Sequence, residues 1–204
     1  QDSNNIWINL FWDNKDIVAT LDSLQPLYQA QIDETLSFSM PEVEEFKGAP
    51  AVTFENGDMS YLTFEGTASG DQGITEESDK VIDGKSSLVF SSSEKDALLL
   101  RSSSAKLKIP SYRTYKLTFD WQIISAKDET NGCDFYATFR SEADVNSTAG
   151  QMGALTFGGV AGDFGTAEAT VNHSSNVKDY VVAFMAGLNS GTVAIDNVNI
   201  VEVE

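Results

Sequence analysis

Apolar and polar residues alternate without exception along residues 115–123, where odd positions are apolar and even positions are polar. Successive side chains of a β-strand point to opposite faces, so this pattern predicts a strand with one buried and one solvated face. We expect the buried face to consist of Tyr115, Leu117, Phe119, Trp121 and Ile123. The outward positions are then Lys116, Thr118, Asp120 and Gln122.

The same alternation returns in residues 134–140. There, the pattern predicts that Phe135, Ala137 and Phe139 face the core. The outward positions are Asp134, Tyr136, Thr138 and Arg140. Alternation of this kind is typical of antiparallel sheets that pack on a core with one face and meet water with the other.

From residue 51 onward, short apolar runs are separated by clusters of Gly, Ser, Asn and Asp. This spacing predicts an all-β fold over residues 47–204, either a sandwich or a barrel. Nothing repeats at a fixed period, which argues against a solenoid or a propeller. We expect strands near residues 51–55, 61–65, 86–91, 97–101, 105–109, 113–124, 133–140, 152–158, 167–172, 178–187 and 191–203.

The pattern of residues 1–46 differs from that of the rest of the chain and predicts an N-terminal extension or small subdomain. The apolar run Ile6–Trp12 is typical of a strand, whereas Ile17, Leu21, Leu24 and Tyr28 fall at helical spacing. The polar start of the chain would suit a tether that follows a lipid anchor. Neighbouring domains or such an anchor would lie outside this chain.

The charge of the chain narrows the classes of partner. Asp and Glu number 31 against 13 Lys and Arg, which gives a formal net charge of −18. Such a field repels a phosphate backbone and an anionic membrane surface, so we expect no nucleic-acid partner. The excess of carboxylates favours hard cations such as Ca²⁺. No apolar run reaches about 18 residues, so no transmembrane segment is predicted.

Cys133 is the only cysteine, which excludes an intrachain disulfide. A cysteine nucleophile needs a histidine partner, and His173 is the only histidine. We therefore expect Cys133 to be a small residue in or near a strand.

Four short motifs follow one another along residues 51–204 in an order that is typical of one superfamily. The segments are Thr53-Phe54-Glu55-Asn56-Gly57-Asp58, Val81-Ile82-Asp83-Gly84-Lys85-Ser86-Ser87-Leu88, Tyr115-Lys116-Leu117-Thr118-Phe119-Asp120 and Thr192-Val193-Ala194-Ile195-Asp196-Asn197-Val198-Asn199-Ile200. Together they resemble the "FE-x-G" opening, "GK-x-S-L" second strand, "Y-x-L-x-F" strand and closing "IDNV-x-I" strand of the jelly-roll carbohydrate-binding modules. This resemblance implies a two-sheet antiparallel β-sandwich of the jelly-roll type over residues 47–204.

The resemblance implies a secreted, periplasmic or cell-surface protein that binds a glycan or polysaccharide without catalysis. It also implies a structural Ca²⁺ beside the first and last strands. Carried over to this sequence, the ligands are Glu55, the carbonyl of Lys85 and Asp196, with Asp58 and Asp83 as further candidates. Calcium binds six to eight hard oxygens, which fits this set.

Sugars bind by stacking on an aromatic ring while polar neighbours hydrogen-bond to the hydroxyl groups. The outward residues Asp120, Gln122, Tyr136 and Arg140 have this chemistry, provided that their two strands are neighbours in one sheet. An ordinary solvated face would look the same. Trp121 is expected in the core, and further rings at edges or loops are Tyr61, Tyr112, Phe164 and Tyr180.

Two other functions stay open. One is a structural or protein-interaction sandwich of a surface lipoprotein or adhesin, which would bury all its large rings. The other is a jelly-roll glycoside hydrolase or polysaccharide lyase. A hydrolase needs two carboxylates about 5–9.5 Å apart, and no outward strand carries such a pair at i, i+2. A lyase would need a base beside an arginine, for which Tyr136 and Arg140 are the candidates. The sequence favours a domain that is not an enzyme.

Overall fold

A computed structural model of the chain describes residue 49 and residues 51–65, 72–92, 94–110, 112–148, 151–173 and 180–203. The predicted N-terminal extension, residues 1–46, lies outside the described residues. None of the described helices is long and apolar enough to cross a membrane.

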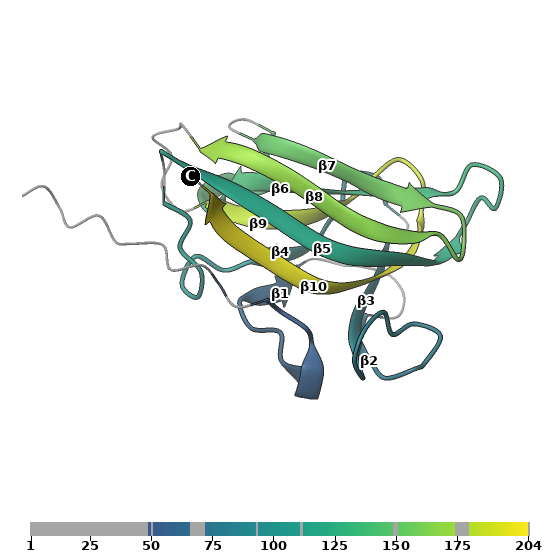
Figure 1. The fold of residues 1–204 in the computed structure, drawn as a ribbon. Helices are drawn as coiled ribbons and strands as arrows, with labels where there is room; N and C mark the ends of the chain where they lie inside the picture. Colours follow the sequence, from purple (N-terminus) through teal and green to yellow (C-terminus); the bar gives the residue numbers. More distant parts are fainter. Residues whose placement is uncertain are drawn as a thin grey trace, which may run out of the picture. The chain divides into compact units, whose positions relative to one another are not determined.

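The described chain is an all-β sandwich of two five-stranded sheets, whose neighbouring strands pair antiparallel (Figure 1). The first sheet has the order β1 (Leu62–Phe64), β4 (Leu98–Ser102), β9 (Tyr180–Ala186), β6 (Cys133–Ser141) and β7 (Met152–Gly159). The second has the order β2 (Gly73–Thr75), β3 (Ser87–Ser92), β10 (Gly191–Val203), β5 (Arg113–Ala126) and β8 (Phe164–His173). Two short 3₁₀ turns, η1 (Glu55–Gly57) and η2 (Glu142–Asp144), complete the elements. The predicted fold class is confirmed.

Two of the predicted strands were wrong, and one short strand was missed. The expected strand 51–55 is reduced to one bridge between Val52 and Val198, because Phe54 and Asn56 have left-handed φ angles of 57° and 58° and turn the chain. The expected strand 105–109 is a turn, in which Leu107 donates its backbone N–H to Ser103 O. The three-residue strand β2 was missed because it is too short to show alternation.

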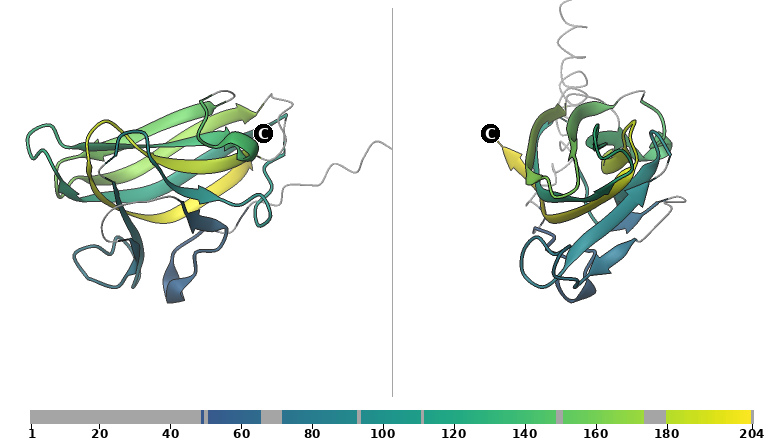
Figure 2. Two further views of the ribbon diagram at one scale, coloured as in Figure 1. Left: turned by 180° about the vertical axis from the view of Figure 1, so that it is seen from behind. Right: turned by 90° about the vertical axis from the view of Figure 1, so that its right-hand side faces the viewer.

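The core lies between the two sheets and follows the predicted alternation. On β5, Tyr115, Leu117, Phe119 and Ile123 are at most 1% exposed, and Trp121 is half-buried. The inner face of β6 is buried as predicted. The right-hand view of Figure 2 looks along the sandwich and shows the strands curving around a common interior.

Strands β7 and β8 form a seam of the sandwich, because β7 is an edge of the first sheet and β8 is an edge of the second. They run side by side in Figure 1 and are joined by residues 160–163. Asp163 holds this connection: its Oδ2 accepts the backbone N–H of Val160 at 2.9 Å. The two sheets therefore end next to each other.

Candidate functional site

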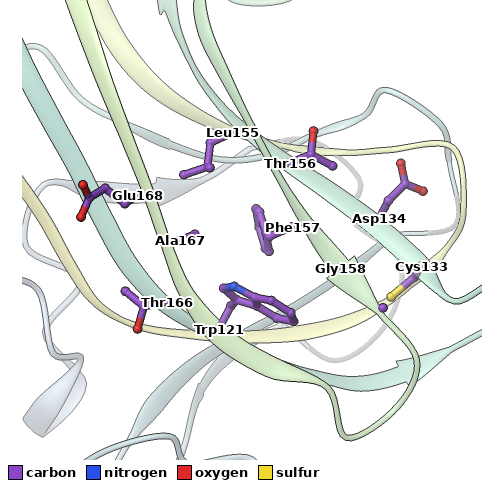
Figure 3. A pocket seen from close by; sticks show the side chains of 11 residues that line it. Trp121, Cys133, Asp134, Leu155, Thr156, Phe157, Gly158, Thr166, Ala167 and Glu168 are labelled. Carbon is purple, nitrogen blue, oxygen red and sulfur yellow. The ribbon is translucent and has the colours of Figure 1, made fainter.

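An open groove lies along the seam between β7 and β8 and has a volume of about 730 Å³ (Figure 3). Inward-facing residues of β5, β7 and β8 form its floor, and polar residues stand along its rim. We call it the seam groove, which is lined by Trp121, Cys133, Asp134, Leu155, Thr156, Phe157, Gly158, Gly159, Thr166, Ala167 and Glu168.

Trp121 is the large ring that the groove exposes. Its cross-strand partner on β8 is Gly165, and a Cβ at that glycine would lie 3.3 Å from the indole. The indole therefore fits because residue 165 has no side chain. Its ring centroid is 6.1 Å from that of Phe157, which packs edge-on against Phe119 at 5.0 Å. Contact with the aromatic core holds the indole in place, and Figure 3 shows it pointing into the groove.

The rim of the seam groove offers hydroxyl and carboxylate groups. Thr156 and Thr166 are exposed on the two edge strands. Glu168 is paired with Lys116 at 2.7 Å and its side chain is more than half exposed. Asp134 accepts backbone N–H groups of Leu188 at 3.0 Å and Asn189 at 2.7 Å, so its carboxylate holds the connection between β9 and β10.

The four predicted sugar-binding residues do not share one face. The prediction required their two strands to be neighbours in one sheet, and this was wrong. Asp120 and Gln122 lie on β5, which pairs with β10 and β8. Tyr136 and Arg140 lie on β6, which pairs with β7 and β9 in the other sheet. The connection between β5 and β6 crosses from one sheet to the other, and alternation along a strand carries no information about that crossing.

Arg140 is buried, although it was predicted to face solvent. It is 2% exposed because the segment after β6 covers it. Its guanidinium donates from Nη1 to Val145 O at 2.9 Å and from Nη2 to Gln151 Oε1 at 2.9 Å. Nη2 also donates to the Tyr136 hydroxyl at 3.4 Å. Thr138, also predicted outward, is fully buried. This part of the sheet is closed.

Asp120 and Gln122 line a second hollow, of about 310 Å³, on the outer face of the other sheet. Phe164, one of the rings expected at an edge, stands in it and is 79% exposed. Of the other rings expected there, Tyr112 is exposed, whereas Tyr61 and Tyr180 are buried. We call this second site the outer hollow, which is lined by Val81, Ile82, Asp120, Trp121, Gln122, Phe164, Gly165 and Thr166.

The three predicted calcium ligands gather around the turn before β3. Glu55 Oε1 accepts the backbone N–H of Lys85 at 2.7 Å and of Ser86 at 3.2 Å. Asp196 is 1% exposed, and its Oδ2 accepts the Ser87 hydroxyl at 2.6 Å. Burial raises the pKa of the Asp196 carboxyl, and the charge of nearby Asp83 adds to that rise.

These residues offer only hard oxygens, which is the chemistry that Ca²⁺ prefers. Within the described ranges, no three side chains of His, Cys, Asp or Glu converge as a metal site. Asp58 is engaged elsewhere, with the backbone N–H of Ser60 at 2.7 Å. An ion beside Glu55 and Asp196 would therefore need backbone carbonyls to complete its coordination.

Neither the cysteine nor the tyrosine that the sequence offered for catalysis is activated by its surroundings. Burial raises the pKa of the Cys133 thiol to about 11, so it stays protonated at neutral pH. Cys133 lies by Ser125 at one end of β5, whereas His173 pairs with Arg113 at the other end. Burial also raises the pKa of Tyr136, the opposite of what a lyase base requires.

The sequence analysis missed the seam groove and placed Trp121 in the core. The signal for the groove was a glycine, Gly165, in a strand that otherwise alternates. Glycine within a strand marks a place where another group approaches closely. Recognising the indole as that group requires the register of β5 against β8, which the pattern of a single strand does not contain.

No protein-family model matches the sequence, and no curated protein matches it. Solved structures do resemble it in fold. One is the CBM22-1 xylan-binding domain from Paenibacillus barcinonensis Xyn10C, at 13% identity and a TM-score of 0.58, over 76% of this chain and 93% of that chain. Another is the Clostridium thermocellum endo-1,4-β-D-xylanase 10B, CBM22-1–GH10 modules complexed with xylohexaose, at 12% identity and a TM-score of 0.57. The match covers 77% of this chain and 28% of that chain.

An α-L-arabinofuranosidase, MgGH51, is also similar, at 10% identity and a TM-score of 0.53, over 76% of this chain and 25% of that chain. At identities this low, the likeness concerns the fold. It confirms the predicted resemblance to the jelly-roll carbohydrate-binding modules as an architecture. Function has to be argued from the site itself.

Proposed function

We propose that this chain is a non-catalytic polysaccharide-binding domain that holds a glycan chain in the seam groove. The observation that carries the proposal is Trp121, a fixed indole on the floor of an open groove. An aromatic ring with polar neighbours is the usual platform for the apolar face of a sugar. Thr156 and Thr166 line the groove on its two edge strands, and the Thr166 hydroxyl, which donates to Asp120, still has a lone pair that can accept from a sugar.

The similar structures support this function. The Paenibacillus barcinonensis domain is named as xylan-binding, and the Clostridium thermocellum modules were solved with xylohexaose. Xylan is therefore the first polysaccharide to test. Because such polysaccharides lie outside cells, we place the domain in an extracellular, periplasmic or cell-surface location.

The carboxylates of the groove favour binding over hydrolysis. A glycosidase needs one carboxyl to act as an acid and another as a base or nucleophile. Here Asp134 is engaged by two backbone N–H groups and Glu168 by Lys116. Asp134 is thus tied to the backbone and the charge of Glu168 is paired with Lys116, whereas the indole gives the groove a stacking surface.

The test is affinity electrophoresis and pull-down on insoluble xylan and cellulose, with the wild-type protein and Trp121→Ala. Loss of the ring should weaken retention at least tenfold, or by about 1.4 kcal/mol. Tyr112→Ala is the matched control, since its ring is exposed, precedes β5 away from Trp121 and lines neither the seam groove nor the outer hollow. Its retention should be unchanged.

Two results would overturn the proposal. If the folded wild-type protein is retained on no polysaccharide, the interaction-sandwich function replaces it. If Trp121→Ala is retained as well as the wild type, the seam groove is not the site. Circular dichroism and a melting curve for each variant show whether it is folded.

We also propose that a structural Ca²⁺ binds at Glu55 and Asp196, with the carbonyl of Lys85. The ion would neutralise the carboxylates of Glu55 and Asp196, which two distant parts of the chain bring to the turn that contains Lys85. An ion that binds only the folded state stabilises it by about 2.7 kcal/mol at a hundred times its Kd. A chelator should therefore lower the Tm of the wild type and leave that of Glu55→Gln unchanged. Equal melting of the wild type with and without chelator would remove the ion from the proposal.

A further inference from the structure

The outer hollow combines an exposed ring with polar groups on the outer face of β5 and β8. Phe164 is directly opposite Gln122 in the register of the two strands. Its backbone is fixed because the connection before it is bonded to β5: Ile123 N–H donates to Asp163 O at 2.8 Å and Gly162 N–H donates to Ile123 O at 2.9 Å. The ring is therefore exposed on a rigid part of the sheet.

The polar groups next to Phe164 are suited to binding hydroxyl groups. Asp120 Oδ1 accepts the Thr166 hydroxyl at 2.5 Å, and Oδ2 accepts the Asn197 amide at 2.9 Å. These bonds fix the carboxylate and leave lone pairs that can accept from a ligand. No described residue hydrogen-bonds to the Gln122 side chain, whose amide offers both donors and an acceptor.

The outer hollow and the seam groove meet at the end of β5. Trp121 and Thr166 line both of them. Gly165, which lies between Thr166 and Phe164 in the chain, has no side chain to separate the two sites. Figure 3 shows Trp121 and Thr166 next to each other at the edge of the groove. A flexible polymer in the groove can thus continue past Gly165 onto the outer face.

We infer that Phe164 is a second stacking platform, so that one glycan chain is held by Trp121 in the seam groove and by Phe164 in the outer hollow. The inference rests on the proposed polysaccharide-binding function. The ligand is an uncharged glycan. The charged residues that line the two sites are Asp120, Asp134 and Glu168, and no described basic residue lines either site. A chain of uronic acids would be repelled by these carboxylates and by the net charge of −18.

The test is calorimetric titration with xylo-oligosaccharides and cello-oligosaccharides of increasing length. In the wild type, affinity should rise again once the oligosaccharide is long enough to reach the second ring. Phe164→Ala should remove that second rise, with a loss of roughly tenfold for the longest oligosaccharides and no loss for the shortest. Phe164→Tyr is the matched control, because it keeps a ring at the position and should keep the rise.

The outcomes separate the inference from the function on which it rests. If the wild type binds no glycan, the proposed function fails first. If Trp121→Ala loses binding while Phe164→Ala matches the wild type at every length, only the second platform is wrong. An equal loss at every length also overturns it, because Phe164 would then act at the first site. Phe164 is exposed, so its variants should melt at the wild-type temperature.

Polygalacturonate tests the ligand class. It should not be retained at low salt, where carboxylates repel it most strongly. Retention of polygalacturonate comparable to that of a neutral polysaccharide would overturn the assignment to uncharged glycans.

Discussion

Each sheet contains a strand in which apolar and polar residues alternate, yet the outer faces of these two strands differ in their exposure to water. On β5, Asp120 and Gln122 face outward and line an open hollow. On β6, Tyr136 and Arg140 occupy the equivalent outward positions, yet Arg140 is buried under the segment that follows the strand. The difference arises because the segment after β6 folds back over Arg140, whereas a hollow stays open beside Asp120 and Gln122. Alternation assigns a side chain to a face, and only the neighbouring segments decide whether that face meets water.

The largest expected effect is on the closed face. Arg140→Ala removes the donor to Val145 O and Gln151 and leaves a void in a buried site. We expect a loss of about 3 kcal/mol in the free energy of unfolding, measured by urea denaturation. Retention on polysaccharide should persist at temperatures where the variant is folded. A loss under about 0.5 kcal/mol would show that this face is open in solution, and the comparison would fail.

The next effect concerns the open side. In Gly165→Ala the new methyl group would press on the indole of Trp121, 3.3 Å from its nearest ring atom. The ring must shift, and we expect retention on polysaccharide to weaken by roughly tenfold. Thr170→Ala changes an exposed residue of the same strand away from both sites and serves as the control. Wild-type retention by Gly165→Ala would mean that the position of the indole does not matter for binding.

The pH dependence of the free energy of unfolding reports on a buried side chain, that of His173. His173 is 1% exposed against Tyr180, and burial lowers its pKa below the usual value of 6.5. The neutral form is favoured in the folded state. The stability linked to it is therefore complete above about pH 6.5 and declines as the pH falls toward the lower folded pKa.

Melting curves between pH 5 and 8 should show this decline in the wild type and not in His173→Phe. Glycan retention should not follow the same titration, because His173 is at the end of β8 opposite to Phe164. A parallel loss of retention and stability would show that the two regions are coupled.

The smallest expected effect is at the rim of the groove. Lys116 pairs with Glu168 at 2.7 Å, and both side chains are substantially exposed. Exposed ion pairs contribute little, so Lys116→Ala should change the free energy of unfolding by less than about 0.5 kcal/mol. Urea denaturation in low and high salt measures it. A larger loss would indicate that Lys116 and Glu168 are shielded from solvent, which would contradict an open rim of the seam groove.

Much of the interior could be predicted from local patterns. The alternation in residues 115–123 and 134–140 identified the core-facing positions of β5 and β6, with Trp121 as the one partly open member. The motifs also identified Glu55, Lys85 and Asp196, which the fold brings close to one turn. These predictions depend on side-chain direction along one strand, or on a resemblance that covers the whole domain.

The site itself depends on relations between strands. Whether β5 and β6 share a sheet is decided by a connection that crosses the sandwich, and nothing in residues 127–132 indicates the crossing. The burial of Arg140 depends on Val145 and Gln151 folding back over it. The exposure of Trp121 depends on the register that sets Gly165 opposite it. Each of these is a long-range property, and a periodic pattern in one strand does not record it.

The seam has a further consequence for how copies of this domain behave in concentrated solution. Strands β7 and β8 end their sheets, so each has a row of backbone groups that its own sheet does not use. Such rows invite strands of other chains to pair with them, which is a common start of aggregation. A net charge of −18 opposes that association by keeping like molecules apart. The acidity of the chain thus opposes self-association through these two edge strands.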